Sequence, residues 1–151
     1  MRENKYLENL LYNIWESSFC DIPRLNIVNI RYGRYSKRRL GSIKMVKDRG
    51  SFERYLKKLD VEEKSLENPS VSLITITKYF SDPLVPEYVI KSTIAHELCH
   101  YAHGFNSPLE KIYQHPHRGG VIKKELAKRD LLDLYIESNT WLKKNWFRFV
   151  S

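Results

Sequence analysis

The chain has few cysteines and no long apolar run, and both absences limit what it can be. Two cysteines among 151 residues are too few for a disulfide framework, and neither stands in a C-x-x-C pair. No apolar stretch approaches the roughly 20 residues that a membrane-spanning helix needs. Residues 1–5 also lack a signal-peptide pattern. We therefore expect a cytoplasmic protein with reduced thiols and no membrane partner.

The length and composition fit one globular domain over residues 1–151. Hydrophobic residues make up 42% of the chain and charged residues 29%, which is ordinary for a soluble protein with a sizeable core. There are no internal repeats or low-complexity tracts.

The periodicity of apolar residues predicts a mixed fold. Helical spacing predicts helices over residues 7–18, 52–59, 119–129 and 131–147. Alternation predicts strands over residues 25–32, 40–46 and 71–78, the first two joined by a hairpin-like connection at 33–39. This order predicts an α+β fold, with a small, mostly antiparallel sheet packed against a metal-binding helix and C-terminal helices.

The most specific motif is His96-Glu97-Leu98-Cys99-His100, an H-E-x-x-H sequence. On a helix, His96 and His100 lie about 40° apart, so both imidazoles can bind one zinc ion from the same face. Glu97 lies beside them as a candidate general base. A zinc ion with three protein ligands keeps a position for water, and a neighbouring carboxylate can take the proton of that water.

The surroundings of the motif predict a helix. Asp82-Pro83 provides an N-terminal cap and a first-turn proline, and Gly104 provides a C-terminal stop. An apolar face opposite the histidines predicts an amphipathic helix, and its residues are Ile90, Ile94, Leu98 and Tyr101.

A third ligand must come from another segment. His117 is the first choice, because it precedes an apolar helical pattern that can pack back against the motif. His115 stands before a proline and is biased towards extended backbone, and Glu125 is the alternative in zinc peptidases that use a glutamate from a later helix. We interpret His103 as a structural residue near the helix end. Neither cysteine is predicted to be a ligand.

The chain resembles the SprT-like (Spartan-related) zincin metallopeptidases over about residues 5–130. The resemblance rests on H-E-L-C-H at 96–100, the strand-like residues 74–77 with Pro83 and Pro86 after them, Leu40-Gly41, and a downstream histidine that leads into a glycine-containing helix start.

The resemblance implies a zincin-like fold, Zn²⁺ held by His96, His100 and His117, and Glu97 as general base. It also implies cleavage of proteins bound on or crosslinked to DNA, a role in DNA repair. Here His117 leads to Gly119-Gly120 instead of to an aromatic residue, which keeps His115 open as the ligand. The chain also has no C-x-x-C pairs for a zinc ribbon, so we expect a minimal catalytic core.

Positive charge is concentrated in one segment. The chain carries a net charge of +8, and residues 31–58 hold eleven Lys or Arg and two acids, a net +9. Aromatic residues interleave with these charges, as in surfaces that contact phosphates and stack on bases. The alternative is a solvated basic segment that keeps the protein soluble. The candidate nucleic-acid-binding residues are Arg31, Arg34, Lys37, Arg38, Arg39, Lys44 and Lys47.

These features support two hypotheses of function. The first is a zinc endopeptidase that cleaves flexible or unfolded polypeptide, including protein bound to DNA. The second is a nucleic-acid-binding module whose zinc site is structural, closed and four-coordinate, with both His115 and His117 as ligands.

Overall fold

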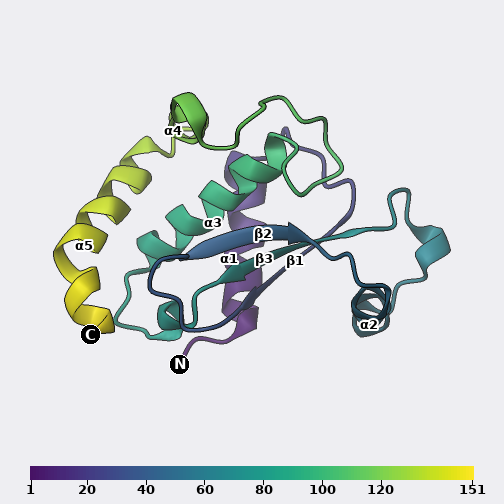
Figure 1. The fold of residues 1–151 in the computed structure, drawn as a ribbon, viewed down its shortest axis with the longest axis horizontal. Helices are drawn as coiled ribbons and strands as arrows, with labels where there is room; N and C mark the ends of the chain where they lie inside the picture. Colours follow the sequence, from purple (N-terminus) through teal and green to yellow (C-terminus); the bar gives the residue numbers. More distant parts are fainter.

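The computed structural model describes residues 1–151 as five α-helices and three strands, a mixed α+β fold (Figure 1). In chain order these elements are α1 (Asn4–Ser18), β1 (Ile27–Tyr32), β2 (Gly41–Met45), α2 (Arg49–Leu59), β3 (Val71–Ile76), α3 (Glu87–Ala102), α4 (Val121–Lys128) and α5 (Leu132–Val150). Short 3-10 helices cover Glu63–Ser65, Lys78–Ser81 and Arg118–Gly120. None of the helices combines the length and the apolar character needed to cross a membrane.

The three strands form one mixed sheet in the order β1-β3-β2. Strand β3 pairs in parallel with β1 and antiparallel with β2. The prediction of a mostly antiparallel sheet is therefore wrong, because one of the two pairings is parallel. The prediction of a hairpin-like connection at residues 33–39 is also wrong, since β1 and β2 lie on opposite sides of β3.

The apolar character of β3 explains why it takes the central position. Val71, Ile74 and Ile76 of this strand are fully buried, and only a central strand has both of its edges hydrogen-bonded. The connection from β1 to β2 bonds to the end of β3 instead of closing on itself. Gly33 N donates to Ile76 O at 2.8 Å, and Leu40 O accepts from Thr77 N at 2.9 Å.

The main core lies between one face of the sheet and helices α1 and α3. Its 21 buried residues include Ile30, Ile43 and Ile74 from the three strands. A smaller cluster of three buried residues, Phe52, Leu56 and Val71, holds α2 against the end of the sheet. Figure 1 shows α2 at the opposite end of the molecule from the C-terminus.

Helix α3 begins later than the sequence predicts. Pro86 stands at its N-cap, whereas Asp82-Pro83 belongs to the preceding turn. There the Asp82 carboxylate accepts a hydrogen bond from Leu84 N at 2.9 Å, which closes a local turn instead of capping a helix. The predicted stop is confirmed: Gly104 follows the helix with φ +83°.

Helix α3 is buried on more than one face. The predicted apolar face is confirmed, since Ile90, Ile94, Leu98 and Tyr101 are at most 1% exposed. However, ten of its 16 residues are buried, among them Glu97 and His100 on the supposed polar front. Contacts of α3 with β2, α4 and α5 cover that front, so the amphipathic expectation is wrong.

We predict that Ile74→Ala lowers the free energy of unfolding by about 2–5 kcal/mol, because it leaves a cavity at the centre of β3 that its neighbours fill only partly. Leu84→Ala is the control, since Leu84 is 78% exposed and its truncation should change stability by less than about 0.5 kcal/mol. Urea unfolding followed by circular dichroism measures both. Equal stability of the two variants would contradict the core described above.

Candidate metal centre

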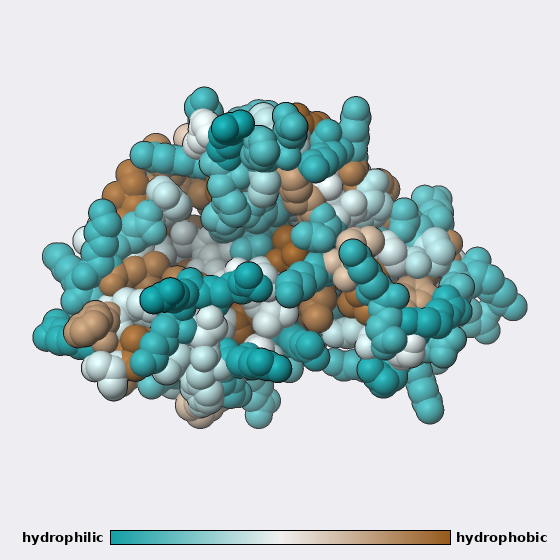
Figure 2. Space-filling model, viewed as in Figure 1, coloured by the Kyte–Doolittle hydropathy of each residue, from teal (hydrophilic) through white to brown (hydrophobic).

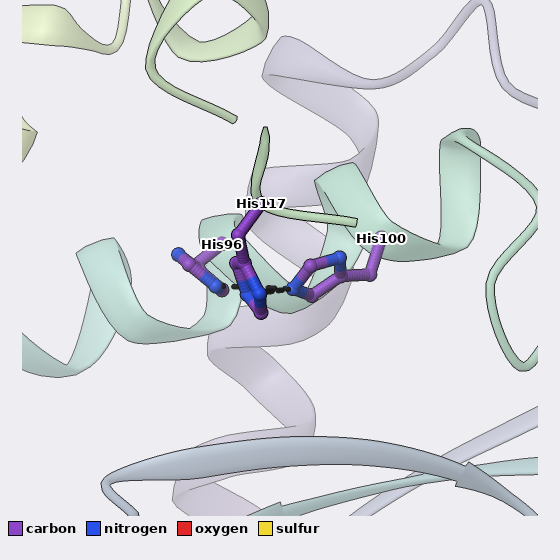
Figure 3. Close-up of side chains that lie close together, drawn as sticks. All are labelled: His96, His100 and His117. Carbon is purple, nitrogen blue, oxygen red and sulfur yellow. Dashed lines mark hydrogen bonds between the residues drawn. The ribbon is translucent and has the colours of Figure 1, made fainter. Parts of the chain in front are cut away.

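Three histidine side chains converge on one point beside helix α3 (Figure 3). His96 and His100 lie one helical turn apart, and their Nε2 atoms are 3.1 Å from each other. His117 comes from the loop before α4, and its Nε2 lies 3.0 Å from that of His100. One ligand nitrogen from each residue falls within 4.8 Å of the other two. These three residues are close enough to hold a metal ion.

Two consecutive glycines allow the loop to deliver His117. Gly119 and Gly120 have φ values of +74° and +67°, a left-handed conformation that L side chains rarely adopt. The chain therefore kinks after His117 and enters α4, where Ile122 and Leu126 are buried in the main core. His115, two residues earlier, is exposed and does not belong to the cluster.

Glu125 does not join the cluster either, because it is bound to other groups. Its carboxylate accepts hydrogen bonds from His103 Nε2 at 2.9 Å and from Arg129 Nε at 2.8 Å. Arg129 in turn donates to the carbonyl of Ser18, the last residue of α1, and to the carboxylate of Asp21. Burial raises the pKa of Glu125, but the bonds from His103 and Arg129 outweigh it, and the pKa lies below its usual value. This network ties the end of α3 to α4 and α1.

The environment favours the neutral form of His96 and His100. Burial, and then the neighbouring His117, lower the pKa of His96 to about 4. Burial, together with the other histidines, lowers the pKa of His100 to about 3. A histidine ligates metal through an unprotonated nitrogen, so these side chains are in the form that binding requires.

The donor set fits a divalent transition metal. Tetrahedral zinc with Zn–N bonds of about 2.0–2.1 Å places its nitrogen ligands roughly 3.3 Å apart, close to the 3.0 and 3.1 Å observed. His100 Nε2 faces two other ring nitrogens but carries either one hydrogen or one lone pair, so it can form only one hydrogen bond. A cation between the rings would instead accept a lone pair from all three. His100 Nδ1 is buried without a hydrogen-bond partner.

The Glu97 carboxyl lies next to the cluster under strand β2. It is 4% exposed, and burial raises its pKa to about 8, with Arg39 the charge that opposes this shift. A Cβ atom built on Gly41 would lie 3.4 Å from Glu97 Oε1 and 2.7 Å from the Thr93 methyl group. Strand β2 can therefore pass this close to α3 only because position 41 is glycine.

A groove runs between β2 and α3 past the histidines. One part, of about 330 Å³, is lined by β2 residues 41–44 together with His96, Glu97, His100 and His117. A second part, of about 510 Å³, extends from His96 and Glu97 to α5. Strand β2 has a single partner in the sheet, β3, so its other edge is free. Figure 2 shows a hollow in the middle of this face, with hydrophilic side chains along its rims.

The structure divides the predicted nucleic-acid-binding residues among different surfaces. Arg31, Arg34, Arg39 and Lys44 line a cavity of about 580 Å³ on the sheet face that the helices leave uncovered. An adjoining cavity of about 430 Å³ shares Arg31 and adds Arg54 and Lys58. Arg38 lies instead in the groove. Lys37 and Lys47 are exposed and line none of these cavities.

Sequence reasoning missed the contribution of α5 to the groove. Tyr135, Ser138, Asn139 and Leu142 of this helix line it, although the aromatic residues of α5 suggest only core packing. The one available signal was a serine, Ser138, within the apolar stripe of the helix.

Cys99 is buried, and burial raises the pKa of its thiol. Neither cysteine belongs to the histidine cluster.

Comparisons of the chain with protein-family models, with curated proteins and with solved structures gave no match. The SprT-like resemblance therefore remains a prediction from the motifs, and function has to be inferred from the site itself.

We predict that His117→Ala abolishes stoichiometric binding of a divalent metal ion, whereas His115→Ala leaves it unchanged. His117 is exposed, so its replacement removes a ligand without removing core contacts. The measurement is metal content per chain by atomic emission after dialysis against zinc, with circular dichroism as the check on folding. Full metal retention in His117→Ala would show that the cluster is not the binding site.

Proposed function

We propose that the chain is a zinc-dependent endopeptidase that cleaves flexible or unfolded polypeptide. The observation that carries the proposal is the convergence of His96, His100 and His117 beside Glu97, in a groove whose wall is a free strand edge. The three imidazoles would hold the ion. A bound zinc ion would act as a Lewis acid on the substrate carbonyl and would lower the pKa of water.

Glu97 supplies the proton chemistry in this proposal. Its carboxylate lines the groove beside His96 and His100, so it lies within the space where water and the scissile amide would meet. It takes the proton of the attacking water and gives it to the nitrogen of the departing amine. Arg39 lies near enough to favour the charged form of Glu97. Gly41 keeps the carboxylate close to β2 without a side chain between them.

The free edge of β2 indicates which class of substrate the groove would bind. An extended peptide can add to such an edge through main-chain hydrogen bonds, which require little of its sequence. Only a segment that can adopt an extended conformation fits, so unfolded or flexible chains are the substrates. Residues 41–44 of β2 line the same part of the groove as the histidines, so the added strand would pass the site.

A structural zinc site is supported less well by the geometry. A closed site needs four protein ligands, and the cluster contains three. His115, the fourth ligand that this alternative requires, is exposed and lies outside the cluster. Three ligands at the edge of an open groove suit a catalytic ion better.

The basic face of the sheet supports a second function, binding of nucleic acid, so that DNA-bound protein is the substrate. Arg31, Thr75 and Ser42 form one row across β1, β3 and β2, and they line the same cavity. Six cations and no acid line the two adjoining cavities, and these cations are Arg31, Arg34, Arg39, Lys44, Arg54 and Lys58. Such a surface matches the phosphates of a nucleic acid backbone.

We predict that Glu97→Gln reduces hydrolysis of an unfolded protein such as reduced casein by at least about 100-fold, because it removes the general base. Zinc content should stay at the wild-type level, since Glu97 is not in the ligand cluster. A folded, protease-resistant domain is the control substrate. Turnover by Glu97→Gln at the wild-type rate, or equal cutting of folded and unfolded protein, would contradict the proposal.

We also predict that replacing Arg31 and Lys44 together by Ala weakens binding of a DNA oligonucleotide. The slope of log affinity against log salt should fall in magnitude by about 1.5 if two phosphate contacts are lost. The control is the double replacement of Lys123 and Lys124, which are exposed on α4 and remove the same charge. Fluorescence anisotropy at several salt concentrations measures the slopes, and identical slopes for the two double variants would count against this surface.

A further inference from the structure

The part of the groove between α3 and α5, here called the α3–α5 pocket, is richer in hydrogen-bond donors than peptide binding through a strand edge requires. It has a volume of about 510 Å³ and adjoins His96 and Glu97. Its apolar residues are few, and the remaining wall comes from serine, threonine, asparagine and arginine side chains.

Two buried serines in this pocket have unused hydroxyl groups. Ser92 on α3 is 6% exposed and Ser138 on α5 is 2% exposed, and both line the pocket. Thr93 and Thr140 on the same helices donate their hydroxyls to carbonyls one turn earlier, whereas neither serine hydroxyl forms a hydrogen bond within the chain. Neither hydroxyl oxygen is a buried atom without a partner, so both open onto the pocket and are available to a ligand.

Two arginines form the rim of the pocket opposite α3 and α5, and hydrogen bonds hold the backbone of their loop. Arg38 and Arg39 both line the pocket. Arg39 N donates to Ser36 Oγ at 3.0 Å, and Ser36 O accepts from Thr77 Oγ1 at 2.7 Å. On the other side, Trp146 of α5 donates from Nε1 to Lys37 O at 2.8 Å. The rim is therefore held between the end of β3 and α5.

The charge of the pocket indicates the ligand. Apart from Glu97, which the proposed mechanism uses, no acidic residue lines it. Two guanidinium groups and two free hydroxyls all donate, and guanidinium groups bind carboxylates with charge-assisted hydrogen bonds. A polypeptide offers one group of this kind, the carboxylate, either on an acidic side chain or at its C-terminus.

We propose that the α3–α5 pocket binds a carboxylate of the substrate next to the scissile bond, so that the enzyme selects acidic positions. This proposal rests on the proposed peptidase function and names its specificity. Arg38 and Arg39 supply the positive charge, and Ser92 and Ser138 complete the donor set at the base of the pocket.

The first test is the set of sites cut in an unfolded protein mixture, read by mass spectrometry. Asp and Glu should be enriched at one fixed position beside the cut. A matched pair of fluorogenic peptides that differ by Glu or Gln at that position should show a kcat/KM ratio of roughly ten or more, the value of one hydrogen bond to a charged group. If free C-terminal carboxylates are the ligand, amidation of the peptide terminus should reduce cleavage instead.

Amino-acid replacements test whether the α3–α5 pocket causes the preference for Glu over Gln. Arg38→Ala should lower the Glu/Gln ratio several-fold, while Arg38→Lys should recover part of the ratio. Lys144→Ala on α5 is the matched control, because it removes one exposed positive charge outside the pocket. A ratio that Arg38→Ala and Lys144→Ala change equally would reflect general charge and overturn the proposal.

A binding measurement separates this proposal from the peptidase proposal. Calorimetry with zinc-loaded Glu97→Gln protein and the same two peptides reports the preference without turnover. Cleavage without acidic enrichment overturns the pocket alone. If the wild type cleaves neither peptide but the Glu peptide binds more tightly, the peptidase proposal is overturned and the pocket proposal stands. If both peptides bind equally, the pocket proposal is overturned.

Discussion

The site depends on the burial of helix α3, because this helix carries two of the three clustered histidines and is held from several directions at once. Helix α3 contacts α1, α4 and α5 as well as strands β2 and β3 of the sheet, and its apolar residues belong to the main core. A helix fixed in this way keeps His96 and His100 in one orientation, since their backbone cannot rotate without opening the core. The third histidine follows from the same packing, because the residues that anchor α4 to α3 come directly after the Gly119-Gly120 turn.

The same burial determines the charges in the site. Low exposure lowers the pKa of His96 to about 4 and raises the pKa of Glu97 to about 8, so both groups are less charged than they would be in water. Three imidazole nitrogens that converge at hydrogen-bond distance form a strong donor set for a cation, and a cation there would favour the ionised form of Glu97. Away from the cluster, the half-buried Glu125 and Arg129 form an ion pair beside His103.

The sequence predicts the local features of this arrangement and misses the non-local ones. The spacing of His96 and His100 follows from helical geometry alone, and Gly104 ends the helix through its own backbone preference. Strand order could not be predicted, because it depends on which strand buries the most apolar surface. Strand β3 lies between β1 and β2, although these two strands neighbour each other in sequence. Asp82 was misassigned since a turn and a helix cap use the same side-chain bond. Ser138 and Asn139 line the groove because α5 packs across α3, and a serine within the apolar stripe of α5 is the one local sign of this packing.

Strand β2 brings the two proposed binding surfaces together. Side chains alternate along a strand, so Ile43 packs in the core while Ser42 and Lys44 line the basic cavity of the sheet face. Because β2 is an edge strand, Arg39 and Lys44 line the groove as well as that cavity. Phosphates bound on the sheet face would therefore neutralise part of the positive charge that attracts a substrate carboxylate. A protein that used both surfaces would then select acidic positions most strongly when free, and would become less selective, without losing the strand edge that binds the peptide, when held on nucleic acid.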